Sequence, residues 1–149
     1  MKRILVLPIL SFFGCSIVTT APELGTRLVL PGSSYFFWSA STASGRTHET
    51  KFAGITYLVE VDKSNRLIYI STTDQNFRTP EGLGVGSTLE VLLAKGASQP
   101  IADAFGRFYT QLPSGWSAEI TLGSGGTEPA LQQSSKVIRY FKKKSPSSP

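Results

Sequence analysis

The residues whose chemistry could support catalysis are few in this chain, and their spacing matches no catalytic motif. His48 is the only histidine and Glu49 follows it, but Phe52 stands where the zinc-protease motif HExxH requires its second histidine. A catalytic triad through His48 would need an activated serine, and no serine lies in the GxSxG elbow typical of hydrolases. Ser124 lies in Gly-Ser-Gly-Gly, a common loop composition. We therefore expect a protein that is not an enzyme.

The composition also limits cofactor chemistry. The chain holds one cysteine and one histidine, which excludes metal sites built from several cysteines or histidines. We expect no metal and no organic cofactor. Glu60 and Asp62 share one face of a predicted strand and resemble a catalytic pair of carboxylates. Because Lys63 and Arg66 lie beside them at the end of a hairpin, we expect solvated charges instead.

The formal net charge of +5 is unevenly distributed along the chain. Basic residues lie at the two ends, and acidic residues slightly outnumber basic ones between Cys15 and Ser135. A nucleic-acid-binding domain would carry its basic face on the fold, so we expect no nucleic-acid partner. Lys142, Lys143 and Lys144 could contact an anionic surface such as lipid, lipopolysaccharide or a wall polymer. The alternative is a tail that only improves solubility.

The first residues have the pattern of an export signal. Met1-Lys2-Arg3 is positively charged, and residues 4–13 form the apolar region of a secretory signal peptide. The stretch from Ile4 to Val18 is shorter than the roughly 20 apolar residues that a membrane-spanning helix needs. We therefore expect this segment to direct export.

Gly14-Cys15, which follows this apolar region, resembles the lipobox of bacterial lipoproteins. The resemblance implies that residues 1–14 are removed and that Cys15 is acylated, with palmitate among the usual fatty acids, to become a membrane anchor. Ser16 follows the cysteine, and in Gram-negative lipoproteins a serine there implies the outer membrane, with the domain facing the periplasm. The alternative is cleavage after Ala21, which would release a soluble periplasmic or secreted protein.

Residues 77–96, FRTPEGLGVGSTLEVLLAKG, connect two predicted groups of strands. Thr79-Pro80-Glu81-Gly82 has the composition of a tight turn. Ser87 and Glu90 match the capping box, in which each side chain bonds the other residue's amide. Leucines at helical spacing follow, and a glycine ends the pattern. The sequence predicts a helix of about two turns over Ser87–Lys95.

Within this segment, Gly82-Leu83-Gly84-Val85-Gly86-Ser87-Thr88-Leu89-Glu90-Val91 resembles a helix start found in many small bacterial envelope proteins. The SmpA/OmlA-type outer-membrane lipoproteins contain a similar sequence. The resemblance implies an uncharacterised small envelope lipoprotein. Those lipoproteins place helices before their sheet, whereas a hairpin comes first in this chain.

Alternation of apolar and polar residues predicts two hairpins. The four strands are expected at residues 55–61, 67–70, 104–112 and 116–122. Residues 27–30 are a further candidate strand, residues 39–46 have loop composition, and Val137–Phe141 fits a last edge strand or a short helix. We predict an α+β fold, with one antiparallel sheet of about four to six strands and one short helix packed on it.

The predicted organisation is a signal peptide, a tether, one domain and a disordered basic tail, at residues 1–14, 15–26, 27–141 and 142–149. The aromatic run Tyr35, Phe36, Phe37 and Trp38 is either a binding surface or a buried strand. Our first hypothesis is a non-enzymatic envelope lipoprotein, anchored through Cys15, that binds an envelope protein or wall polymer. The alternative is a soluble periplasmic or secreted binding protein, similar to an inhibitor.

Overall fold

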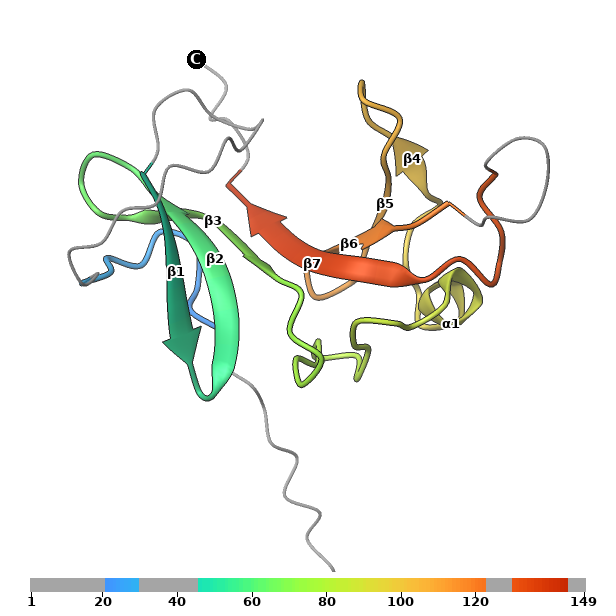
Figure 1. Ribbon diagram of the computed structural model, residues 1–149, viewed down its shortest axis with the longest axis horizontal. Coiled ribbons are helices and arrows are strands. Elements are labelled where there is room, and N and C mark those ends of the chain that lie inside the picture. Colours follow the sequence, from blue (N-terminus) through green and yellow to red (C-terminus); the bar gives the residue numbers. More distant parts are fainter. Residues whose placement is uncertain (1–20, 30–45, 123–129, 145–149) are drawn as a thin grey trace, which may run out of the picture.

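The computed structural model describes residues 21–29, 46–122 and 130–144, which contain seven strands and one short helix (Figure 1). In chain order the elements are β1 Arg46–Phe52, β2 Ile55–Val61, β3 Leu67–Thr72, α1 Leu89–Ala94, β4 Ile101–Ala102, β5 Phe108–Gln111, β6 Ser117–Ile120 and β7 Val137–Lys143. All strands belong to one antiparallel sheet in the order β1-β2-β3-β7-β6-β5-β4. The predicted α+β class is confirmed, and the expected strand number was too low.

The sheet consists of two meanders joined through β7. Strands β1 to β3 form the first meander, β4 to β7 form the second, and β3 pairs with β7 (Figure 1). Val137–Phe141 was expected to form an edge strand or a short helix, but β7 lies between β3 and β6. Val137 and Tyr140 are buried in the core, and the backbone of β7 is paired on both sides.

Strand β1 was not predicted. It pairs with β2 along its whole length through the two-residue turn Ala53-Gly54, whose residues both have positive φ, as this hairpin type requires. Its sequence RTHETKF contains one large apolar residue, so no apolar alternation marks it as a strand. In contrast, the candidate strand at residues 27–30 is reduced, within the described residues, to a single bridge between Arg27 and Arg66.

The core lies on one face of the sheet and is centred on Phe77. Its ring lies 4.8 Å from that of Trp116, 5.5 Å from Tyr140 and 6.1 Å from Tyr57, measured between centroids. Phe77 belongs to the segment between β3 and α1, so this crossing segment covers the core face of both meanders. Burial of four aromatic side chains at one point supplies much of the apolar area that stabilises a domain of this size.

The helix begins two residues later than predicted, its N-cap lies one residue later, and the expected capping box is absent. The N-cap of α1 is Thr88, whose hydroxyl accepts from the amide of Val91 at 3.5 Å. Ser87 instead binds Gly84, with its hydroxyl accepting from the Gly84 amide at 3.2 Å. The amide of Glu90 donates to the carbonyl of Gln133 at 3.0 Å. Pairing with the strand-like residues before β7 therefore replaces the reciprocal bonds of a capping box.

Two turns of the same type meet on the edge of the core. In the Thr79–Gly82 and Leu112–Gly115 turns, the closing glycine amide donates to the first residue's carbonyl, at 2.8 and 2.9 Å. The carboxylate of Glu81 joins them, accepting from the amide of Ser114 at 2.7 Å and from its hydroxyl at 3.0 Å. These bonds fix the crossing segment to the β5–β6 hairpin.

The described N-terminal residues are part of the domain, which corrects the predicted tether at residues 15–26. Ala21 and Leu24 pack against the core. The Gly25 amide donates to the carbonyl of Leu67 at 2.7 Å, and the Leu67 amide donates to Thr26 at 2.9 Å. Any free tether after Cys15 is therefore shorter than the sequence predicted.

The C-terminal boundary is also corrected. The basic tail was expected to begin at Lys142, but β7 continues through Lys143, and the amide of Lys144 donates to the carbonyl of Ile68 at 2.9 Å. Pairing with β3 orders these lysines, because the free edge of β3 needs a partner for its backbone groups. Residues 145–149 lie outside the described part of the chain.

Candidate binding face of the sheet

The sheet face opposite the core carries a mixed set of polar and aromatic side chains, which we call the polar-aromatic face. Strand pairing places Leu58 opposite Ser71, and Ser71 opposite Phe141, in one row across the sheet. The Phe141 ring stacks on Tyr69 at 6.1 Å and meets the edge of Tyr109 at 6.1 Å. All three rings are partly exposed. Glu119 and Arg139, from β6 and β7, complete this face.

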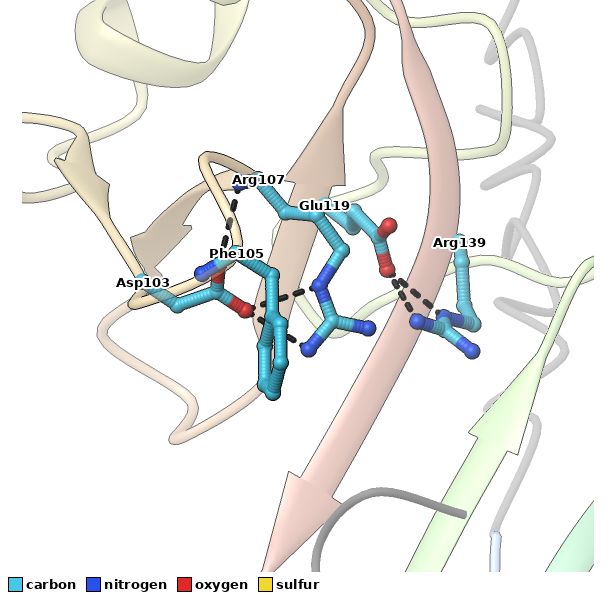
Figure 2. Close-up of polar contacts among 5 residues, drawn as sticks. All are labelled: Asp103, Phe105, Arg107, Glu119 and Arg139. Atoms are coloured by element: carbon cyan, nitrogen blue, oxygen red, sulfur yellow. Dashed lines mark hydrogen bonds and ion pairs between the residues drawn. The ribbon is translucent and has the colours of Figure 1, made fainter. Parts of the chain in front are cut away.

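Four charged residues of alternating sign extend from the β4–β5 turn across the polar-aromatic face, and we call them the charge ladder: Asp103, Arg107, Glu119 and Arg139 (Figure 2). Arg107 Nε donates to Asp103 Oδ2 at 2.7 Å. Arg139 donates through Nε to Glu119 Oε2 at 2.9 Å, and through a second guanidinium nitrogen to the same oxygen. The hydrogen bond that Arg107 donates to Asp103, and then the charges of Asp103 and Glu119, raise the pKa of Arg107.

An exposed aromatic side chain lies at the outer end of the charge ladder. Phe105, in the β4–β5 turn, is 73% exposed, and the Arg107 guanidinium carbon lies 5.4 Å from its ring centroid (Figure 2). The turn itself is fixed by Asp103, whose carboxylate accepts from the amides of Phe105 and Arg107 at 2.9 and 3.0 Å. A rigid turn therefore presents a ring and a guanidinium together.

A pocket of about 310 Å³ opens beside the inner end of the charge ladder. It is lined by residues of β1, β2, β3 and β7 and of the segment after β3, namely Glu49, Thr56, Leu58, Ser71, Thr72, Thr73, Asp74 and Arg139. The Asp74 carboxylate accepts from the amides of Thr56 and Asn76 at 3.0 and 2.9 Å, and these bonds, that of Thr56 first, lower its pKa. Arg139 contributes to both the pocket and the ladder. The pocket lining carries hydroxyls, two carboxylates and one guanidinium, although most of its accessible surface is apolar.

The residues predicted as possible catalytic groups are not brought together. His48 is buried in β1, opposite Val59. Glu60 was expected to be a solvated charge, but its side chain is 2% exposed. In the sheet it lies between Thr47 and Tyr69. Asp62 lies in the β2–β3 turn, where backbone amides, that of Arg66 first, lower its pKa. Its role there is to hold the turn.

The three lysines predicted as one anionic-surface contact point in different directions. The Lys142 ammonium lies 5.1 Å from the Trp116 ring centroid, beside the core. Lys143 is the next residue of β7 and is paired with Tyr69, so its side chain lies on the polar-aromatic face. Lys144 follows the strand, and its amide still bonds to the carbonyl of Ile68 on β3. Strand formation therefore divides the basic cluster that the sequence alone indicated.

Two other predicted sites lie outside the described residues. These are the acylation site Cys15 and the aromatic run Tyr35, Phe36, Phe37 and Trp38. The charge ladder was not predicted from the sequence. Asp103 and Arg107 are four residues apart, so their pairing had a local signal. Glu119 and Arg139 are 20 residues apart, and their pairing follows only from the pairing of β6 with β7.

Within residues 21–29, 46–122 and 130–144, no group of three or more His, Cys, Asp or Glu side chains could hold a metal ion. In the same part of the chain, no helix has the length and apolar character needed to cross a membrane.

The chain matches no protein-family model and no curated protein. A structural comparison aligns it with the crystal structure of the uncharacterised protein yfeY from Escherichia coli. The sequence identity is 14% and the TM-score is 0.43, over 77% of this chain and 83% of that chain. A likeness at this level identifies neither a family nor a function.

Proposed function

We propose that this protein is a non-enzymatic bacterial cell-envelope lipoprotein that acts as an interaction module. Acylated Cys15 anchors it, most simply at the outer membrane, and the domain faces the periplasm. The polar-aromatic face binds the partner, which is an envelope protein or a wall polymer. The leader sequence before Cys15 and its resemblance to a lipobox support the anchor.

The observation that carries the binding role is the juxtaposition of aromatic rings and arginines on the polar-aromatic face. Tyrosine, phenylalanine and arginine are enriched where proteins contact one another, because they combine large apolar area with directed hydrogen bonds. Here Tyr69, Tyr109 and Phe141 form one cluster beside Arg139. Arg139 binds Glu119 through Nε and one terminal nitrogen, and its side chain also lines the adjoining pocket, where it can bind a ligand.

The anchor is tested by the intact mass of the mature protein from a native bacterial host, with Cys15→Ser as control. A chain that begins at Cys15 and carries diacylglycerol and a further acyl group supports the proposal, provided that the mass is lost in the control. An unmodified chain beginning after Ala21 would remove the anchor and favour the soluble periplasmic or secreted binding protein.

The binding face is tested by site-specific photo-crosslinking in living cells. A photoreactive phenylalanine analogue at Tyr109 should yield a discrete crosslinked product. The matched control is the same analogue at Val91, an exposed residue of α1 on the other side of the fold. Products of equal yield at both positions, or none at Tyr109, would count against the polar-aromatic face as the partner's site.

A further inference from the structure

Four exposed cations gather at the end of the sheet where the chain enters the domain, and we call this the basic end: Arg27, Lys63, Arg66 and Lys144. Arg27 lies directly opposite Arg66 in an antiparallel bridge. The guanidinium of Arg66 donates to the carbonyl of Gly25 at 3.2 Å. Lys144 follows the end of β7, where its amide binds Ile68 on the neighbouring β3. The cluster therefore draws on three separate parts of the chain.

Two acidic residues lie near the basic end, and neither removes its positive character. Asp62 Oδ1 accepts from the amides of Ser64 and Arg66 at 2.8 and 2.9 Å, which holds this carboxylate in the turn, and the four cations outnumber the two acids. Glu23 is exposed in residues 21–29, the segment by which the chain enters the domain. Val29, at the end of this segment, is 99% exposed. An exposed apolar side chain beside several cations suits the interface of a bilayer.

The position of the basic end is fixed relative to Cys15 by covalent geometry. The domain holds the chain from Ala21 onward, because Ala21 and Leu24 pack on the core and Gly25 bonds to Leu67. Cys15 and Ala21 are six residues apart in the sequence. Even a fully extended chain spans at most about 20 Å over that separation. An acyl chain on Cys15 would therefore hold this end of the domain close to the membrane surface.

We propose that the basic end contacts anionic phospholipid headgroups and thereby sets the orientation of the domain on the membrane. This inference rests on the proposed lipid anchor. Attraction between basic residues and an anionic bilayer decays over a Debye length of about 8–10 Å. Because the connection between Cys15 and Ala21 is short, the basic end can come within this distance of the membrane surface. The acyl groups keep the protein at the membrane, and the basic end selects which side of the domain faces the lipid.

Vesicle binding of the chain from Cys15 onward, carrying Cys15→Ser, tests the basic end without an acyl group. The protein should co-sediment with vesicles of phosphatidylglycerol and phosphatidylcholine more than with phosphatidylcholine alone, and high salt should weaken this binding. Lys63→Gln with Lys144→Gln should weaken it about twenty-five-fold, since each basic residue near the surface contributes about fivefold. The control pair Lys51→Gln with Lys95→Gln changes the net charge equally and should leave binding near the parent level.

Three outcomes would overturn the proposal: no preference for phosphatidylglycerol, equal loss in the two lysine pairs, or displacement by inorganic phosphate beyond that by chloride at the same ionic strength. The last would indicate a site for free phosphate. The rate at which each lysine is acetylated, in the chain that carries only Cys15→Ser and is bound to the same vesicles, gives a second measurement. Lys63 and Lys144 should react more slowly than Lys51 and Lys95. Because this chain has no acyl group, its binding and the acylation of Cys15 can fail independently.

Discussion

Two tyrosines packed around Phe77 should respond in opposite ways to the same substitution. Tyr57 is fully buried, and its hydroxyl forms no hydrogen bond with the residues that the structure describes. Tyr140 is also fully buried, but its hydroxyl donates to the carbonyl of Gly84 at 3.2 Å. Phenylalanine preserves both rings and removes only the hydroxyls. The comparison therefore isolates the free energy of one unpaired and one paired buried group.

The expected magnitudes follow from the cost of burying polar atoms. An unpaired buried hydroxyl costs about 1–3 kcal/mol, so Tyr57→Phe should raise the free energy of unfolding by about 1 kcal/mol. Tyr140→Phe removes a buried hydrogen bond and leaves the Gly84 carbonyl without it, so it should lower that free energy by about 1–3 kcal/mol. Urea unfolding at pH 7, followed by the fluorescence of Trp116 beside Phe77, measures both values.

Alkaline titration provides a second readout of the same two groups. Burial, and then the charge of Asp74, raises the pKa of Tyr57 from 10.0 to about 12, and burial raises the pKa of Tyr140 to about 12. Since both pKa values are higher in the folded state, their stabilising contribution is complete below pH 10 and is lost as the pH rises to 12. Tyr57→Phe should make this loss less steep. A Tyr57→Phe variant that is as destabilised as Tyr140→Phe, with an unchanged alkaline slope, would refute the reasoning.

Three further predictions concern the turns that hold the crossing segment. Glu81→Ala removes both bonds to Ser114 and should lower the free energy of unfolding by about 1 kcal/mol in urea, whereas Glu90→Ala, at an exposed helix position, should change it little. Asp74→Asn should flatten the loss of stability in acid. The folded pKa of Asp74 lies below 3.8, so its stabilising contribution is present above pH 3.8 and is lost as the pH falls through the folded pKa. Thermal melts between pH 2 and 6 measure this loss. Gly115→Ala should cost about 1 kcal/mol or more in urea, because φ is +81° there, and an unchanged midpoint would contradict the turn geometry.

The sequence predicted those parts of the fold in which one strand face is buried and the other is not. Ile55, Tyr57, Val59 and Val61 alternate with less apolar residues, and all four are buried on the core face of β2. This alternation is a local property, so it is readable before any partner strand is known. The short helix was found for the same reason, since its buried leucines recur at helical spacing.

The elements that the sequence did not predict depend on partners far away in the chain. β1 is polar and is held by its backbone bonds to β2. β7 has a short apolar pattern that fits an edge strand equally well, and its central place follows only from pairing with both β3 and β6. The N-cap moved from Ser87 to Thr88 because residues before β7 take the amides that a capping box would use. Local patterns carry no information on these distant bonds.

The same strand that joins the two meanders also joins the pocket to the charge ladder. β7 pairs with β3 on one side and with β6 on the other, and its Arg139 lines the pocket while binding Glu119 of β6. A ligand that engages Arg139 would therefore bind only when β7 is in place between the meanders. By linkage, such a ligand must stabilise the folded sheet, and the stabilisation rises with the logarithm of its concentration once this exceeds its Kd. Binding on the polar-aromatic face and cohesion of the sheet are thus expected to be coupled through one strand.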